Sequence, residues 1–579
     1  MEGKGRINFL LGCFLLLGLL IIFRLYYWQV VAGEELAAAA ESQYQISFEI
    51  PAKRGQILAS DGFPLATTQE AYLVFASLPD IKGNPEEIAS KLAPLLVDEK
   101  EATPGGKIDY QDSLLAREEL IKERLNRTDL NWVPLEHKIS RQLKEAIEAL
   151  SIEGIGFEEE QRRSYPEGSS SAHLLGFVGQ DINGRDQGYF GLEGYYNLEL
   201  TGRAGVVHRE KDAAGRPILV GQIRDEEQHH GRDLLTTIDR SVQYIIENHL
   251  EKGLERYGAT SGSVVVMEPE GAILAMAALP AYNPFQYQQY DKELYPNPNV
   301  AFSFEPGSTF KIAVMSAALN EGVVKPDTKC DQCEGPRVIA DYVIKTWNEE
   351  YFPDCTVVEI IEHSDNVGMI FVGEKLGIDK MVEYLKKFGL GEKTGIDLED
   401  ELKPELRPDE EWGLIDLATA SFGQGIALTP IQMTRIAATI ANGGQLVRPY
   451  LVKQIIGDEK EITIGSEIKR EVISSATAKV MTEIMVNAVD NGEAKWAKPP
   501  GYRIAGKTGT SQIPVAGHYD KEKTIASFVG FAPADEPKFI MLVTLREPTS
   551  SEWGSETAAP LWFDIAKDLF NYYGVLPGS

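Results

Sequence analysis

The longest apolar run of the chain lies at its N-terminus, where NFLLGCFLLLGLLIIF covers residues 8–23. Together with the following RLYYWQVV, this run is about long enough to cross the hydrocarbon core of a bilayer. We therefore predict one transmembrane helix over residues 8–31, after a short tail of residues 1–7. Lys4 and Arg6 predict that the tail stays on the cytoplasmic side, because positively charged flanks are retained there.

A cleaved signal peptide is the alternative interpretation of this run. However, no Ala-x-Ala-type cleavage site directly follows it, and Tyr26, Tyr27 and Trp28 suit the outer interface of the membrane. We expect an uncleaved anchor, with the chain beyond about residue 32 outside the cytoplasm. Arg24, at the membrane edge, either reaches lipid headgroups or contacts a partner helix.

Residues 32–230 show mixed patterns, which predict an extended domain of helices and strands. Alternating apolar and polar positions from residue 46 onward predict strands around a Ser-Asp-Gly turn at residues 60–62. Leucines and charged residues at helical spacing between about 80 and 160 predict a mostly helical subdomain. The Gly-rich, aromatic stretch over residues 176–205 predicts turns and short strands.

Residues 231–579 are predicted to form a single α+β domain. A strand near residue 233 leads into an amphipathic helix that ends at Gly258, and two apolar strands follow around a Pro-Glu-Gly turn. Near the C-terminus, a second pair of strands surrounds an Asp-Glu-Pro turn, and a last helix covers residues 560–574. This order predicts one sheet that is assembled from both ends of the domain.

The composition adds one conclusion to this picture, because it excludes one class of partner. The formal net charge is −30, whereas a protein that binds nucleic acid presents basic faces to the phosphates. We therefore expect no nucleic-acid partner. A hydrophobic content of 43% and a charged content of 25% are ordinary for a globular protein.

One strongly apolar segment carries an unexpected pair of polar groups. Residues 308–320 are predicted to form a helix that is buried all round, between a Pro-Gly pair and Gly322. Ser308 and Lys311 lie one turn apart on one face of it. Burial lowers the pKa of a lysine, so the neutral amine can accept the proton that makes a serine hydroxyl nucleophilic. By itself, the Ser-x-x-Lys spacing recurs by chance.

Two further motifs supply groups that such a pair needs. Ser364, Asp365 and Asn366 form Ser-x-Asn, and Lys507 opens Lys-Thr-Gly-Thr. Ser364 can relay a proton, because a hydroxyl both donates and accepts, and the Asn366 amide can hold a substrate amide. Each motif alone is explained equally well as a helix cap or a strand end. Together, and in this order, the three motifs form the set found in penicillin-binding proteins and class A β-lactamases.

The third motif has the features of a peptide-binding edge strand. Lys507, Thr508 and Thr510 offer a cation and two hydroxyls to a substrate carboxylate. Gly509 allows a substrate backbone to lie close, so that an extended peptide pairs as an added strand.

The chain resembles the class B penicillin-binding proteins, which are monofunctional peptidoglycan D,D-transpeptidases. FEPGSTFK is similar to their nucleophile segment, and ATASFGQGIALTPIQM, with Gly423, Gln424 and Gly425, to a segment between their second and third motifs. AKRGQIL and FGLEGYYNLELTGRAG resemble their N-terminal pedestal, and SFVGFAPADEPKFIMLVTL their terminal strands. A β-lactamase lacks the pedestal and the anchor, and a class A penicillin-binding protein carries a glycosyltransferase domain first.

The resemblance implies a fold and a reaction. The fold is a membrane anchor, a pedestal or dimerisation-type domain, and a transpeptidase domain in which helices flank an antiparallel sheet, as in serine β-lactamases. Ser308 attacks the penultimate D-alanine of a stem peptide, and an amino group of a neighbouring peptide then takes the acyl group. The backbone N–H groups of Ser308 and Thr510 form the oxyanion hole. The catalytic residues implied in this way are Ser308, Lys311, Ser364, Asn366 and Lys507.

The resemblance also implies partners and a location. No metal or organic cofactor is needed, and β-lactams are expected to acylate Ser308 by the same route. The expected partner is a polytopic glycosyltransferase of the SEDS type in the bacterial cytoplasmic membrane, and Arg24 and the anchor are candidate contacts. Within the class, GLEGYYNLELTGRAG and the overall length favour the division-type branch over the elongation-type branch.

Three of the four cysteines lie between the first two motifs. Cys330-x-x-Cys333 could bind zinc together with Cys355 and either His363 or Asp354. Alternatively, a disulfide joins Cys355 to one of the other two, as an oxidising compartment would allow. Free thiols are the third possibility.

Other functions remain open at this point. A β-lactam sensor acylates without turnover, but such sensors usually have several membrane helices. A D,D-carboxypeptidase differs only in using water as the acceptor, and the pedestal favours transpeptidation. A non-catalytic scaffold of the wall machinery would not need all three motifs.

Overall fold

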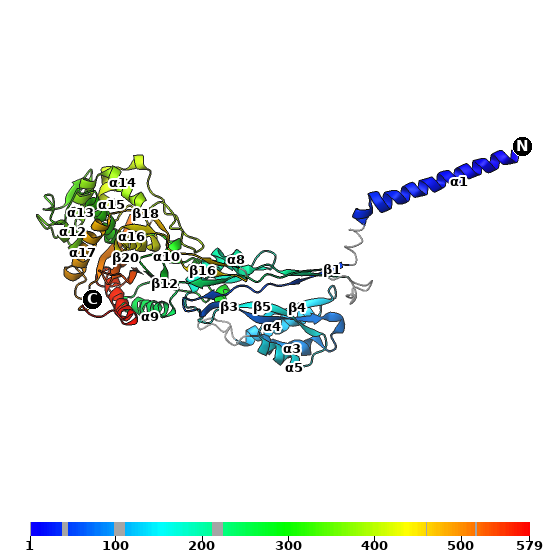
Figure 1. Ribbon diagram of the computed structural model, residues 1–579. Coiled ribbons are helices and arrows are strands. Elements are labelled where there is room, and N and C mark those ends of the chain that lie inside the picture. Colours follow the sequence, from blue (N-terminus) through cyan, green and yellow to red (C-terminus); the bar gives the residue numbers. More distant parts are fainter. Residues whose placement is uncertain are drawn as a thin grey trace. The chain divides into compact units, whose positions relative to one another are not determined.

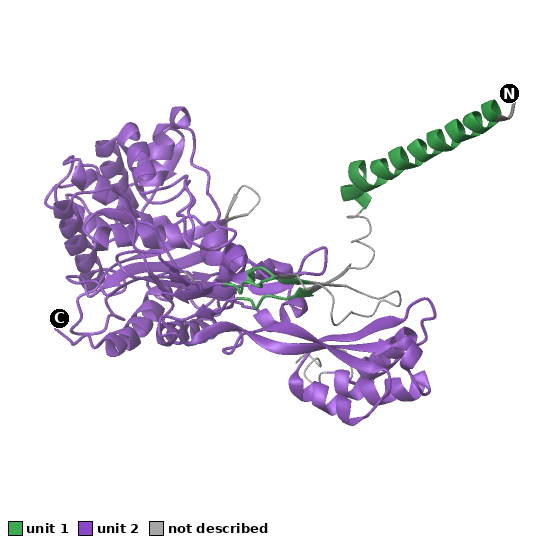
Figure 2. Cartoon of the chain, turned by 45° about the vertical axis from the view of Figure 1, so that its right-hand side comes forward, with its two compact units in different colours: residues 1–54, 201–231 green, residues 55–200, 232–579 purple. Residues whose placement is uncertain are grey.

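The computed structural model divides the chain into two compact units (Figures 1 and 2). One unit comprises residues 1–54 and 201–231, and the other comprises residues 55–200 and 232–579. Part of the predicted helical subdomain, residues 98–109, lies outside the described residues. The structure describes residues 2–36, 45–97, 110–210, 224–458, 460–515 and 518–578.

The smaller unit holds the N-terminal helix and one small sheet. Helix α1 spans Glu2–Tyr26 and continues as a π-helix over Tyr27–Val31. Among the described residues, Lys4–Val31 is the one helix long and apolar enough to cross a membrane, with a mean hydropathy of 2.4, as predicted. The sheet is antiparallel and consists of β1 (Gln45–Ile50), β8 (Gly205–Glu210) and β9 (Arg224–Glu226).

The larger unit begins with a layer built on one long strand. Strand β3 (Pro64–Ser77) pairs antiparallel with both β4 (Trp132–Ile139) and β5 (Ile155–Ser164). The predicted turn over residues 60–62 joins β3 to the short strand β2 (Ile57–Leu58). Buried side chains of β3, β4 and the helices form one core. These helices are α3 (Pro85–Leu96), α4 (Tyr110–Leu125) and α5 (Arg141–Ala149).

The Gly-rich stretch over residues 176–205 contains helices that the sequence did not predict. The expected short strands are present as β6 (Phe177–Gln180) and β7 (Asp186–Tyr189). Two short helices follow them, α7 (Gly191–Tyr195) and α8 (Asn197–Thr201). Each buries a leucine completely, so tertiary packing overrides the weak helix propensity of a segment rich in glycine and aromatic residues.

One sheet joins strands from both sides of the expected domain boundary near residue 231. Strand β10 (Asp233–Thr236) pairs in parallel with β2 and antiparallel with β16 (Val452–Ile456). The sheet continues from β2 into β3 and β4, and from β16 into β17 (Glu461–Thr463). The catalytic part is therefore continuous, through hydrogen-bonded strands, with residues 57–77.

The centre of residues 232–579 is a five-stranded antiparallel sheet with the order β12-β11-β21-β20-β19. This arrangement confirms the sheet predicted from both ends of the domain. Strands β11 (Ser261–Met267) and β12 (Ile273–Leu279) come from its start. The other three come from its end and are β19 (Ala505–Val515), β20 (His518–Ala532) and β21 (Phe539–Arg546).

Helices cover both faces of this sheet (Figure 1). Val264 and Val266 of β11 pack into one core with α9 (Arg240–Tyr257) and α18 (Ala558–Tyr573). Val265, the residue between them, packs into the opposite core, because successive side chains of a strand point to opposite faces. The apolar run in the sequence thus reflects a strand that is buried on both sides.

The opposite core carries the helices that position the site. They are α11 (Lys311–Asn320), α12 (Val357–Glu362), α13 (Asn366–Leu376), α14 (Ile378–Lys387), α15 (Leu414–Ser421), α16 (Pro430–Ala441) and α17 (Ser475–Asn491).

Candidate active site

The segment around Ser308 begins as a tight turn, whereas the sequence predicted a regular helix from residue 308. A 3-10 helix spans Gly307–Phe310 and leads into α11. Gly307 has φ +53°, a left-handed conformation that favours glycine. A Cβ at this position would lie 2.8 Å from the carbonyl oxygen of Thr510. The turn therefore packs directly against β19 and places Ser308 beside this edge strand.

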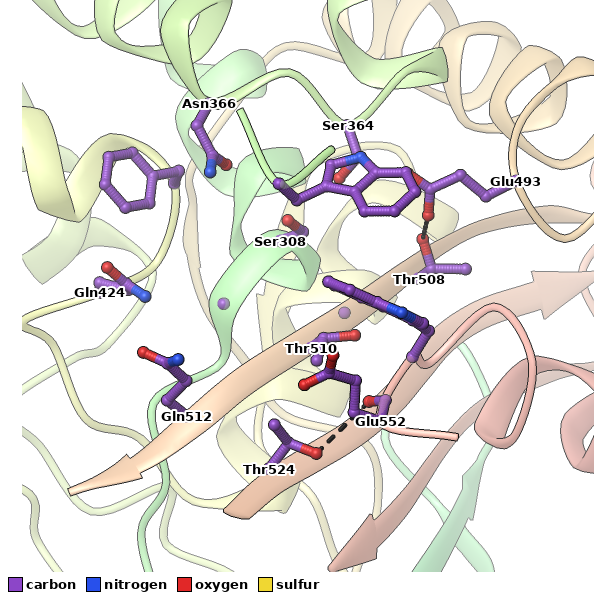
Figure 3. A pocket seen from close by; sticks show the side chains of 15 residues that line it. Ser308, Ser364, Asn366, Gln424, Glu493, Thr508, Thr510, Gln512, Thr524 and Glu552 are labelled. Carbon is purple, nitrogen blue, oxygen red and sulfur yellow. Dashed lines mark hydrogen bonds between the residues drawn. The ribbon is translucent and has the colours of Figure 1, made fainter. Parts of the chain in front are cut away.

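Ser308 lines a cavity of about 270 Å³, whose wall is formed by residues from several elements (Figure 3). Ser364, Asn366, Thr508 and Thr510 line the same cavity, so the structure brings the three motifs together. Within the described part of the chain, the Ser308 hydroxyl makes no hydrogen bond to another residue, which leaves it free to turn toward a substrate.

Lys311 is completely buried, as the apolar sequence around it predicted. Its Nζ donates hydrogen bonds to the carbonyl oxygen of Ser364 (2.6 Å) and to Oδ1 of Asn366 (2.8 Å), and it lies 3.4 Å from the Ser364 Oγ. Burial, aided by the positive charge of Lys507, holds the pKa of Lys311 well below its usual range. The amine is thus suited to accept a proton.

The Ser-x-Asn motif forms the turn between α12 and α13. Ser364 has φ +53°, which is uncommon for a residue with a side chain, and it is stabilised by Asp365, whose Oδ1 accepts from the Val367 N–H (2.8 Å) at the start of α13. Such strain occurs where the surrounding structure fixes a functional group. The turn directs the Ser364 carbonyl oxygen and the Asn366 Oδ1 toward Lys311. The Asn366 amide nitrogen donates to the Lys345 carbonyl oxygen (3.3 Å).

Lys507 completes a hydrogen-bonded chain around Ser364. Its buried Nζ donates to the Ser364 Oγ (2.9 Å) and to the Thr508 Oγ1 (3.1 Å). Burial lowers the pKa of Lys507 to about 8, and the opposing negative charge of Glu493 limits this decrease. Lys507 therefore remains largely an ammonium group at neutral pH, in contrast to Lys311.

Strand β19 is the edge strand that the third motif predicted, because it pairs only with β20 in the described sheet. Gly509 lines the cavity, and the absence of a side chain there has a second reason besides the expected approach of a substrate. A Cβ there would lie 2.6 Å from the Ser527 Oγ and 2.7 Å from the Thr309 Cγ2. Gly509 thus makes room for the nucleophile turn and for β20. The Thr510 Oγ1 accepts from the Gly554 N–H (2.9 Å).

Several residues of the cavity wall were missed by sequence reasoning. Trp347 and Trp553 have ring centroids 4.8 Å apart, and Glu493, Gln512 and Glu552 line the cavity with them. They lie outside the three motifs, in loops and on β19, and only long-range folding brings them to Ser308. No local pattern in the sequence could have identified them.

The segment with Gly423 and Gln424, which the resemblance singled out, supports the nucleophile turn. The N–H of Gly307 donates to the carbonyl oxygen of Gly423 (3.0 Å), and Gln424 lines the cavity. A Cβ at Gly423 would lie 2.1 Å from the Gly307 carbonyl oxygen, so this approach also requires glycine.

The cysteines differ from the expected pairing. A disulfide joins Cys330 to Cys333, whereas the disulfide considered from the sequence, one of three possibilities, included Cys355. Cys355 is a buried free thiol, and its Sγ lies within 4.8 Å of the Cys333 Sγ and of a carboxylate oxygen of Asp365. Neither of the metal ligands proposed for the fourth position, His363 and Asp354, belongs to this cluster; the His363 ring stacks on Phe352 instead. Two sulfurs engaged in a disulfide cannot serve as thiolate ligands, so the cluster does not support the zinc site.

Comparisons with known proteins agree with this site. Residues 262–571 match the penicillin-binding protein transpeptidase domain, and residues 49–236 match the penicillin-binding protein dimerisation domain. The chain is 34% identical to stage V sporulation protein D of Bacillus subtilis (99% of this chain, 86% of the relative) and 28% identical to the probable peptidoglycan D,D-transpeptidase PenA of Neisseria gonorrhoeae (100% and 94%). The crystal structure of penicillin-binding protein 2X from Streptococcus thermophilus has the same fold, with a TM-score of 0.72 at 24% identity over 91% of this chain and 80% of that one. The chain therefore belongs to the class B penicillin-binding proteins and is a peptidoglycan transpeptidase.

Proposed function

We propose that the chain cross-links peptidoglycan stem peptides as a serine D,D-transpeptidase, with Ser308 as the nucleophile and Lys311 as its general base. The observation that carries this proposal is the pair of hydrogen bonds from Lys311 to the Ser364 carbonyl oxygen and the Asn366 Oδ1. A neutral amine has two N–H groups, and both are used here. Its lone pair is thus left for the hydroxyl protons at the site.

In the acylation step, each proton that moves has a named donor and acceptor. The Ser308 Oγ attacks the carbonyl carbon of the penultimate D-alanine, while its proton passes to the Lys311 amine. The backbone N–H groups of Ser308 and Thr510 stabilise the oxyanion. When the C–N bond breaks, the leaving D-alanine nitrogen receives a proton from the Lys311 ammonium through the Ser364 hydroxyl.

Transfer to the acceptor reverses these proton movements. The incoming amine loses its proton through Ser364 to Lys311 as it attacks the acyl-enzyme, and the Ser308 oxygen recovers a proton as it leaves. The same groups serve both steps, because acceptor and leaving amine occupy equivalent positions. β-Lactams acylate Ser308 by the first step. The leaving nitrogen stays attached to the acyl group, so an acceptor amine cannot enter for the second step.

The geometry of β19 supports an extended peptide as the substrate. The edge strand offers unpaired backbone groups, so a donor peptide can add as a further strand. The positive charge of Lys507 and the Thr510 hydroxyl hold the terminal carboxylate, and the Thr510 N–H lies at the scissile carbonyl. The remaining stem peptide then extends along β19 toward Gln512, which also lines the cavity.

The rest of the chain positions this domain at the membrane. Residues 8–31 form the anchor, the tail of residues 1–7 stays in the cytoplasm, and residues 32–230 form a pedestal for an extracytoplasmic domain over residues 231–579. A SEDS-type glycosyltransferase supplies the glycan strands, in division-type wall synthesis. Protease added to spheroplasts should digest the chain beyond residue 32; full protection would contradict this orientation.

The Arg24 guanidinium lies 4.8 Å from the centroid of the Trp28 ring in the same helix. Arg24 and Trp28 thus lie on one side of this helix, and we expect them at the membrane interface, where Arg24 is available to headgroups or to the partner.

Acylation of the detergent-purified full-length chain by a fluorescent penicillin tests the nucleophile. Ser308→Ala should abolish covalent labelling, whereas Ser303→Ala, a change at a nearby exposed serine, should leave it intact. Equal labelling of Ser308→Ala and the unaltered chain would overturn the proposal. A cross-linking assay with nascent glycan then distinguishes transpeptidation from D,D-carboxypeptidation.

A further inference from the structure

A carboxylate outside the three motifs lies at the end of the hydrogen-bonded chain in the active site. Glu493 follows α17 in the sequence and lines the cavity beside Thr508 (Figure 3). Its Oε2 accepts a hydrogen bond from the Thr508 Oγ1 (3.3 Å). Its Oε1 is buried and has no hydrogen-bond partner among the described residues. A carboxylate in this setting needs compensation from nearby positive charge.

The hydrogen bonds along this hydrogen-bonded chain have a defined direction. A carboxylate only accepts, so the single hydroxyl proton of Thr508 is directed to Glu493. The Thr508 oxygen must then accept from Lys507 (3.1 Å). Lys507 also donates to the Ser364 Oγ (2.9 Å), which leaves the Ser364 proton for the opposite side, where Lys311 lies.

The charges around the two lysines favour the same arrangement. Four ionisable side chains meet here, namely the two lysines, Asp365 and Glu493. The negative charge of Glu493 raises the pKa of both lysines. The charge of Asp365 also raises the pKa of Lys311, and burial raises the pKa of Asp365. The neighbouring His363 lowers the pKa of Asp365. The exposed Glu552 lies elsewhere on the cavity wall.

We propose that Glu493 is a positioning residue that fixes the direction of this chain, keeps Lys507 as a charged donor, and thereby aims the Ser364 proton at Lys311 and the reacting amine. This inference rests on the proposed function, because it concerns the same acyl transfer. Glu493 touches neither Ser308 nor the scissile bond in this scheme and acts through Thr508 and Lys507.

The pH dependence of acylation tests this role. Loss of the Glu493 charge removes an effect that raises the pKa of both lysines. Lys507 must be protonated and Lys311 neutral, so both limbs of the rate profile should move to lower pH. We expect the acylation rate of Glu493→Gln, relative to the unaltered chain, to fall at least about threefold more at pH 9 than at pH 6.5, since one pKa unit corresponds to a factor of ten.

Three comparisons separate this effect from a structural one. Glu536→Gln, at an exposed carboxylate outside this cavity, should keep the original profile. Glu493→Asp should restore most of it, because the charge returns. Glu493→Thr, a smaller uncharged substitution, should show the same acid shift and serves if the glutamine variant does not fold.

An unshifted profile for the uncharged variants, scaled by a constant factor at every pH, would overturn the inference. That result would leave the proposed function intact as long as Ser308→Ala abolishes labelling. Equal labelling of Ser308→Ala would instead refute the proposed function itself, whatever the profile of the Glu493 variants.

Discussion

Two lysines of the site illustrate how position decides chemistry at the scale of a residue. Lys311 and Lys507 are both buried, and both contact the Ser364 hydroxyl. Two oxygen acceptors take the two N–H groups of a neutral Lys311 amine. The positive charge of Lys507 repels a second cation, so the neutral form of Lys311 is favoured. Lys507 is compensated by Glu493 and keeps its charge. The sequence predicted the first lysine from its apolar neighbours, whereas nothing near the third motif identified Glu493.

Replacement of Lys311 by methionine tests its role as the base. Methionine fills a similar volume, so we expect folded protein with a melting temperature close to that of the unaltered chain. Acylation by a fluorescent penicillin should slow by about 10²- to 10⁴-fold, the contribution typical of a general base. Lys479→Met, at an exposed lysine of α17, is the matched control and should acylate normally. A Lys311→Met chain that acylates at the original rate would show that another group removes the Ser308 proton.

At the scale of the element, the site depends on the close approach of β19 to the nucleophile turn. Periodicity and turn residues were sufficient to predict β11, β12, α9 and the terminal strands, because each is a long or strongly patterned segment. The same reasoning could not show that Ser308 lies in a 3-10 turn, since this turn packs against Thr510, which is far away in the sequence. For the same reason, the sequence could not show that Gly509, assigned to substrate binding, also allows these two elements to pack closely.

A single added methyl group should separate the two elements. In Gly509→Ala, the new Cβ would lie within 2.7 Å of the Thr309 Cγ2 and the Ser527 Oγ, so the strand must shift. We expect the free energy of unfolding to fall by about 1–3 kcal/mol. Acylation should slow by about 10- to 100-fold, because the Thr510 N–H moves away from the oxyanion. Thermal unfolding and labelling rates measure the two effects.

The control for this substitution is Gly335→Ala, because a Cβ at Gly335 would meet no atom within 4 Å. It should leave both the melting temperature and the labelling rate unchanged. If Gly509→Ala behaved like this control, β19 would not need to lie so close to the turn.

At the scale of the whole molecule, the sequence predicted a pedestal region followed by a catalytic region but not how they are connected. Ile57, Leu174 and Leu192 from the first region lie in one hydrophobic core with Leu234 and Met276 from the second. These contacts join residues far apart in the sequence, so no local pattern could predict them. The division at residue 231 remains a prediction about sequence segments, while this core and the sheet through β10 are continuous across it.

This shared core predicts that residues 232–579 do not fold well alone. Each large apolar side chain uncovered costs about 1.5–3 kcal/mol, and several such losses approach the roughly 5–15 kcal/mol that stabilises a typical domain. The buried Asp397 would also lose the hydrogen bond that its Oδ2 accepts from the Tyr196 hydroxyl (3.0 Å). We expect this fragment to aggregate or to unfold without cooperativity, and to label poorly with fluorescent penicillin. The chain from residue 45 onward, which lacks only the anchor segment, should remain soluble and label normally. Light scattering and thermal melting compare the two, and a soluble, cooperatively folded fragment with the original labelling rate would show that the catalytic region is independent of residues 55–200.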